Sequence, residues 1–168
     1  MKKIAGKLVN VQYAVSIACA LILLLMIGWE VLARYVLKVS LMGLDEWIVF
    51  PIIWLYMLGG CNASYENSHI ECGILVLYIK KERSKLIFEC VKRTLSVIIL
   101  AWITYWGGYY FLYSLYTWKL ADISSAPLFF ANIALSIGFL IMEIYAIRDV
   151  IRAYKALFAY KGKEEEKA

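Results

Sequence analysis

Few residues in this chain have the types and spacing that catalysis or metal binding needs. The lone histidine, His69, cannot supply both ligands of a bis-histidine haem and argues against a zinc site. No nucleophile elbow, Walker loop or dinucleotide fingerprint is present. The cysteines form no C-x-x-C pair, which argues against thiol redox chemistry: Cys19, Cys61, Cys72 and Cys90. We therefore expect no enzymatic activity and no cofactor within this chain.

Charged and aromatic residues near two predicted helix ends are better candidates for contacts than for chemistry. Glu30 and Arg34 are four residues apart, so they share a helix face and can pair, either as an anchor or as a contact for a partner. Asp45 and Glu46 precede Trp47, where acidic groups complement a helix N-terminus. Both acidic residues could instead contact a protein outside the membrane. We take these five residues as candidate subunit-contact or docking residues.

Two further polar residues need an explanation. His69 follows the second apolar stretch and is predicted to be a hydrogen-bonded junction residue, with a proton relay as the alternative. Glu143 lies about 24 Å along a helix that begins at Pro127. It could snorkel, pair with Arg148, or meet a cation on another chain. We assign both His69 and Glu143 structural polar roles.

The elements that must position these residues are four apolar stretches. Each is long enough to cross a hydrocarbon core of about 30 Å: residues 11–37, 47–65, 95–116 and 127–147. A content of 63% hydrophobic residues and a mean hydropathy of +0.70 exceed what a soluble domain keeps off its surface. The sequence predicts an all-α integral membrane protein, with residues 1–168 forming one domain of four transmembrane helices.

The lysines and arginines predict the orientation of these helices. Fifteen of the 18 basic residues fall in the N-terminal segment, the segment between the second and third stretches, and the C-terminal segment. Positive-inside sorting therefore predicts that both termini are cytoplasmic. The positive net charge is explained by topology and anionic lipid head groups, so we expect membrane lipid and not nucleic acid as a partner.

Residues 66–90 are predicted to be cytoplasmic or interfacial. An apolar run at 70–79 precedes a charged run at 80–85, which is too short and too charged to span. One or two amphipathic helices along the membrane surface fit this pattern, and an ordinary loop is the alternative. Residues 155–168 are predicted to form a cytoplasmic tail.

The order of short motifs along these stretches resembles the small Q subunit (DctQ-like) of tripartite ATP-independent periplasmic, or TRAP, transporters. The motifs are Arg34-Tyr35 at the end of the first stretch, Asp45-Glu46-Trp47, Trp54 followed by Leu58-Gly59-Gly60, His69-Ile70-Glu71, and the run from Ile137 to Met142. The resemblance covers most of the chain and implies a multi-pass protein of the bacterial cytoplasmic (inner) membrane.

The resemblance also implies partners. A large (M-type) membrane subunit would hold the substrate and Na+ sites, and an extracytoplasmic (P-type) binding protein would deliver an organic acid such as a dicarboxylate or sialic acid. The small subunit would stabilise the large, elevator-type subunit as a scaffold. Two other classes of protein stay open. A four-span proton-coupled exporter is disfavoured because Arg34 would hold Glu30 ionised. A redox or quinone-linked subunit is disfavoured by the lone histidine.

Overall fold

The computed structural model describes residues 2–67, 78–79 and 81–165 of the chain. Within these residues the regular structure is helical, apart from one isolated bridge between Leu120 and Pro127. The long helices are α1 (Lys2–Tyr35), α2 (Leu44–Glu66), α4 (Glu82–Thr117) and α5 (Phe129–Glu165). The predicted all-α class is confirmed for this part of the chain.

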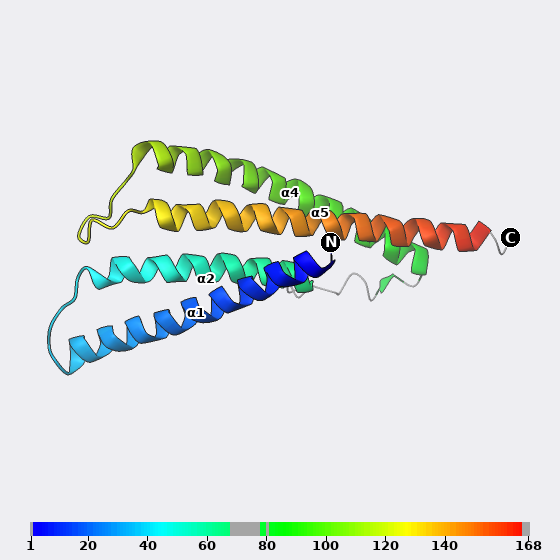
Figure 1. Cartoon of the computed structure of the whole chain (residues 1–168). Helices are drawn as coiled ribbons and strands as arrows, with labels where there is room; N and C mark the ends of the chain where they lie inside the picture. The colour runs from blue at the N-terminus through cyan, green and yellow to red at the C-terminus, as the bar shows by residue number, and fades with distance from the viewer. Residues whose placement is uncertain (1, 68–77, 80, 166–168) are drawn as a thin grey trace.

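The helices lie side by side in a row rather than around a central core. Helix α1 packs on α2, α2 on α5, and α5 on α4, so the spatial order is α1, α2, α5, α4 (Figure 1). The α1–α2 and α4–α5 connections lie at one end of the row, and both described chain ends lie toward the other. Helices α1 and α4 at the edges therefore each have one main neighbour, and much apolar surface remains uncovered.

The helices end where the backbone turns left-handed. Asn67 follows α2 with φ 54°, and its backbone N–H bonds to the carbonyl of Ala63. Trp118 follows α4 with φ 42°, and its N–H bonds to the carbonyl of Ser114 at 3.1 Å. Such left-handed residues close a helix by satisfying a carbonyl that the next turn would have used.

The helix surfaces are apolar enough for a membrane protein. By length and composition, three segments could cross a membrane: Gly6–Tyr35, Leu44–Glu66 and Phe129–Tyr160. They overlap the first, second and fourth predicted spans. The third predicted span, at 95–116, lies within α4, which is not among these three segments. A four-span arrangement and the single domain over residues 1–168 therefore stay predictions.

The segment predicted to be interfacial differs in part from the expectation. Residues 82–90 are not a separate surface helix but the first turns of α4, which continues without a break to Thr117. Glu89 pairs with Lys92 and Arg93 one turn later, and such pairs favour helix continuity. Residues 68–77 and 80 lie outside the described residues.

Small residues let α5 and α2 approach each other closely. A Cβ atom added to Gly138 would lie 2.8 Å from the Cβ of Met57 on α2. At Gly60 of α2 the nearest atom would be the sulfur of Met142, at 3.1 Å. Apolar side chains gain little by leaving lipid for each other, so this close backbone approach is a main source of helix association.

Hydrogen bonds also join each pair of neighbouring helices. Between α5 and α4, Ser136 donates to the carbonyl of Gly107 at 2.9 Å, and Asn132 donates to Ser114 at 2.8 Å. The Cys61 thiol on α2 donates to the carbonyl of Gly138 at 3.4 Å. Asn62 of α2 donates to Ser16 of α1 at 3.4 Å. Each pair of neighbouring helices is thus joined by polar contacts, and α2 and α5 are also joined by close packing at glycine.

We expect Gly138→Ala to destabilise the chain. The new methyl group would meet a Cβ atom fixed to the α2 backbone, so the helices must separate, at a cost of about 1–3 kcal/mol. Gly59→Ala is the matched control, because no atom lies within 4 Å of the position of its Cβ. Unfolding midpoints in one detergent compare the two variants. Equal midpoints would contradict the close α2–α5 packing.

Candidate subunit-contact sites

Glu46 in the first turn of α2 holds the connection between α4 and α5. Its Oε1 atom accepts from the backbone N–H of Ile123 at 3.0 Å, and its Oε2 atom accepts from that of Ser124 at 2.6 Å. Hydrogen bonds that involve an ionised carboxylate are stronger than neutral ones. Glu46 therefore ties the start of α2 to a loop 77 residues later in the sequence.

The loop held by Glu46 is a narrow hairpin. Its two sides are joined by bonds from the N–H of Ala121 to the carbonyl of Ala126 at 2.8 Å and from Leu128 to Lys119 at 3.1 Å. Ser125 at the turn has φ 53°. With these internal bonds and the Glu46 carboxylate, the loop presents a defined shape at the end of the row away from the chain termini.

The predicted acidic pair thus divides into two roles. Glu46 makes an internal contact, and this explains its position better than capping of its own helix alone. Asp45 and Trp47 are exposed beside it, with Trp47 48% exposed and in ring contact with Phe50. Asp45 and Trp47 are therefore the members of this motif that remain accessible to another protein.

Glu30 and Arg34 form the predicted pair at the end of α1. The Nη2 atom of Arg34 lies 2.6 Å from the Oε1 atom of Glu30. The Arg34 side chain is 57% exposed and that of Glu30 is 17% exposed. The arginine therefore keeps donors for a further contact, while the glutamate is largely occupied. A docking role for either residue stays a prediction.

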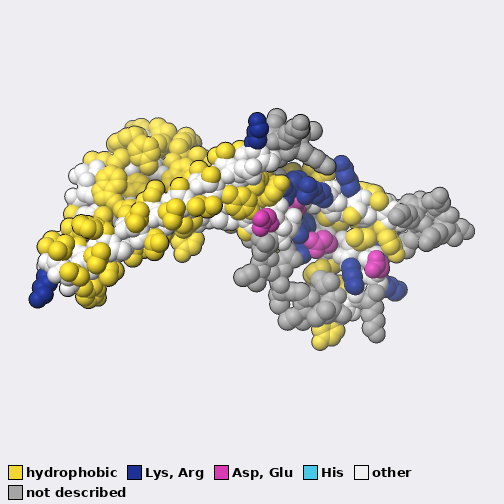
Figure 2. Space-filling model, turned by 60° about the horizontal axis from the view of Figure 1, so that its bottom comes forward, with side chains coloured by type: hydrophobic (Ala, Val, Ile, Leu, Met, Phe, Trp, Pro, Cys, Tyr) yellow, Lys and Arg dark blue, Asp and Glu magenta, His cyan; other side chains and the backbone are white. Residues whose placement is uncertain are grey.

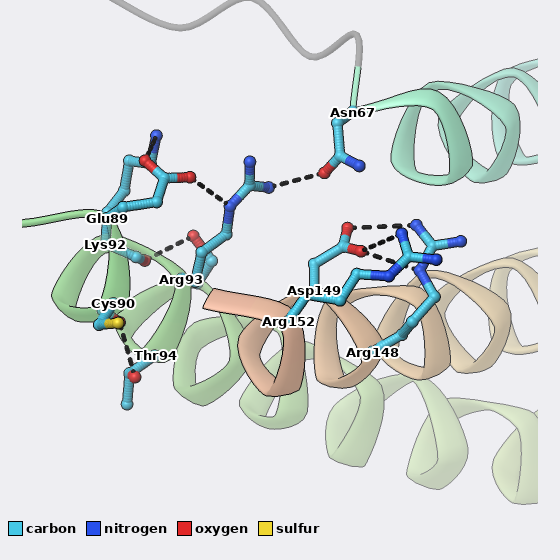
Figure 3. A network of polar contacts seen from close by, with 10 residues as sticks. Asn67, Glu89, Cys90, Lys92, Arg93, Thr94, Arg148, Asp149 and Arg152 are labelled. Atoms are coloured by element: carbon cyan, nitrogen blue, oxygen red, sulfur yellow. Dashed lines mark hydrogen bonds and ion pairs between the residues drawn. The ribbon is translucent and has the colours of Figure 1, made fainter. Parts of the chain in front are cut away.

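A network of charged residues gathers at the opposite end, near the chain termini. Arg93 of α4 donates to Glu89 at 2.8 Å (Figure 3). It also donates to the side chain of Asn67, the residue that follows α2, at 2.9 Å. Burial alone would raise the pKa of the Glu89 carboxyl, but the hydrogen bonds from Lys92 and Arg93 outweigh it and lower that pKa. Glu89 is therefore a carboxylate that links α4 to the end of α2.

Arg148 extends the charged network along α5. Its guanidinium binds Asp149 at 2.8 and 3.2 Å and donates to the carbonyl of Tyr65 at 3.1 Å. It also lies 5.1 Å from the ring centres of Tyr65 and Tyr145. A cation at the end of α2 is favourable because free carbonyls make that end negative. Arg148 therefore joins α5 to the last turn of α2.

The pairing of Glu143 with Arg148, one of three predicted possibilities, does not occur. Arg148 binds Asp149 instead, because the adjacent carboxylate and the α2 carbonyls lie within its reach. The Oε2 atom of Glu143 is buried and has no hydrogen-bond partner among the described residues. His69, the other predicted structural polar residue, lies outside the described part of the chain.

Sequence reasoning missed most of the charged network. The spacing of Glu89, Lys92 and Arg93 was a visible signal for pairs within one helix. The contacts of Asn67 and Asp149 depend on which helices are neighbours, and no local pattern gives that. Among the described residues, no group of three or more His, Cys, Asp or Glu side chains could hold a metal ion.

Long apolar helices with charges at their two ends define a membrane protein of the helical class. On the face shown in Figure 2, apolar side chains cover most of the length of the helices, and charged side chains gather at the end near the chain termini. Residues 22–156 match the family model of the DctQ component of tripartite ATP-independent periplasmic transporters. The chain belongs to this family and is a small membrane subunit of a TRAP transporter. Among curated proteins, no relative matches the sequence.

We expect Glu46→Gln to loosen the α4–α5 loop. The amide keeps one acceptor oxygen but turns an NH2 group toward a backbone donor, so at least one loop N–H loses its partner. Amide exchange at Ile123 and Ser124 should speed up about tenfold. Asp45→Asn removes the neighbouring charge without touching the loop and should leave exchange unchanged. An unaltered loop in the Gln variant would show that Glu46 does not hold it.

Proposed function

We propose that this chain is the static scaffold subunit of a sodium-coupled, binding-protein-dependent transporter for organic acids. It stabilises the large membrane subunit, which carries the substrate and sodium sites, while an extracytoplasmic binding protein delivers the substrate. A dicarboxylate or a sialic acid is the substrate class we favour. Membership of the DctQ family supports the assembly, and the remaining details are our inference.

The observation that carries the scaffold role is the open row of helices. Each edge helix has one main neighbour, and much of its surface is uncovered apolar side chain. A transporter that works alone needs a site between its helices, often at broken helices near the membrane midplane. The described helices here are continuous, and charged side chains gather toward the end of the molecule near the chain termini (Figure 2). Such a molecule is suited to being covered by a larger membrane protein.

We propose a four-span arrangement in the bacterial cytoplasmic membrane with both termini in the cytoplasm. The asymmetry of basic residues supports it, and so does the clustering of charged side chains at the end near the termini. The Glu46-held loop and the Glu30–Arg34 pair would then face the external compartment, where the binding protein docks. Helix α4 would be the third span, with its exposed aromatic side chains near the outer interface.

Labelling of single cysteines tests this orientation. In a cysteine-free background, cysteines at Met42 and Asp122 should react with an impermeant maleimide in intact cells, whereas one at Ser84 should react only after lysis. All three positions are exposed in the folded chain, so burial does not bias the comparison. Reaction at Ser84 from outside would reverse or break the proposed topology.

Reconstitution tests the function. Purified and inserted alone into liposomes with a sodium gradient, the chain should take up no organic acid. Together with its large membrane subunit and binding protein, uptake should appear and should require sodium. Gradient-driven flux by this chain alone would refute the scaffold role and favour the small-exporter alternative.

A further inference from the structure

An open groove between α4 and α5 has no role in the contacts described so far. It encloses about 700 Å³ and is lined mainly by apolar and aromatic α4 residues. Thr104, Tyr105 and Gly108 of α4 are among them, and Glu143 is the α5 residue in the lining. A Cβ atom added at Gly108 would meet nothing within 4 Å, so another backbone has room to approach there.

Two polar atoms in this groove lack partners. The Oε2 atom of Glu143 and the Oγ1 atom of Thr104 are both buried, and neither has a hydrogen-bond partner among the described residues. A buried carboxylate oxygen without a donor is costly, and ionisable groups within membrane helices usually face protein or a cavity. Glu143 therefore brings an acidic side chain without a partner cation to the lining of a mainly apolar groove.

The depth of Glu143 limits what can supply the missing donor. It lies about 21 Å along α5 from Phe129, and Arg148 and Asp149 are more than one turn further on. A lipid acyl chain that filled the groove would supply no hydrogen-bond donor to Glu143. Between Leu95 and Ile147 the only basic residue is Lys119, at the far end. A second copy of this chain, packed in parallel, would bring another carboxylate to that depth but no cation.

We propose that a transmembrane helix of the large membrane subunit packs into the α4–α5 groove and places a cationic side chain against Glu143. The inference rests on the proposed function, because it names the surface through which the scaffold binds its partner. Charge complementarity selects this occupant over lipid and over a second copy.

Photo-crosslinking locates the contact. Benzoylphenylalanine replaces Tyr105, which lines the groove, or Tyr110, which does not line it; the two tyrosines are 68% and 45% exposed. Each variant is co-expressed with a tagged large subunit, and crosslinks are identified by mass spectrometry. We expect Tyr105→benzoylphenylalanine to crosslink to a helix of the large subunit and the Tyr110 variant to do so several-fold less. Crosslinks from position 105 only to lipid or to a second copy would overturn the proposal.

The charge is tested by Glu143→Gln, with Asp122→Asn as a control that removes an exposed loop charge. Glu143→Gln should reduce the large subunit retained during purification about three- to tenfold. The unfolding midpoint of the isolated chain should stay the same or rise, because a neutral amide is less costly to bury. Asp122→Asn should change neither quantity.

The outcomes separate this inference from the proposed function. If the wild-type chain retains the large subunit but Glu143→Gln retains it equally well, the groove contact is wrong and the scaffold role stands. If the wild-type chain never retains the large subunit, the scaffold role itself fails. A lower midpoint of the isolated Gln variant would show that Glu143 serves the fold of this chain, and would also overturn the proposal.

Discussion

The contact between α2 and α5 holds the row of helices together. In hydrocarbon, apolar side chains gain little by touching each other instead of lipid, so close backbone approach and hydrogen bonds must supply the attraction. The absence of a side chain at Gly138 lets the backbone of α5 approach Met57 of α2. The backbone carbonyl of Gly138 also accepts a hydrogen bond from the Cys61 thiol. At one end of this seam Arg148 reaches the last carbonyls of α2. Helices α1 and α4 then attach to the outer sides of this central pair.

The two ends of the row are built differently. At one end, the Glu46 carboxylate holds a hairpin loop by accepting hydrogen bonds from its backbone N–H groups. The Glu30–Arg34 ion pair lies in the last turns of α1 at the same end. At the other, several arginines and two carboxylates, Glu89 and Asp149, join three helices. The second arrangement suits a membrane surface with anionic lipids, where basic residues are favourable. The first presents the loop held by Glu46 to the external side that we propose.

The sequence predicts those features that depend on local spacing. The helical class, three of the apolar segments and the Glu30–Arg34 pair follow from helix periodicity, run length and an i,i+4 spacing, and all agree with the structure. The continuity of α4 through residues 82–90 was missed, because a charged run resembles a surface segment whether or not it continues into a span. Within the described chain, the pairs of Glu89 with Lys92 and Arg93 favour this continuity.

Features that depend on helix order could not be predicted. The bond from Glu46 to Ser124 and that from Arg93 to Asn67 require knowing which helices are neighbours. The same holds for Glu143: its depth was visible from the sequence, whereas its separation from Arg148 depends on the competing carboxylate of Asp149. Its missing partner becomes a clue only when the lining of the groove is known.

The central claim is that this row of helices is completed by a larger membrane subunit. The Cys61 thiol, fully buried on α2, reports unfolding of this chain alone when the other cysteines of the complex are replaced. Its labelling by a thiol-reactive dye is followed on heating, for the isolated chain and for the complex with the large subunit in the same detergent. A partner that binds only the folded chain must raise the temperature at which Cys61 reacts, and this is the predicted result. An identical temperature for the isolated chain and the complex would contradict the account.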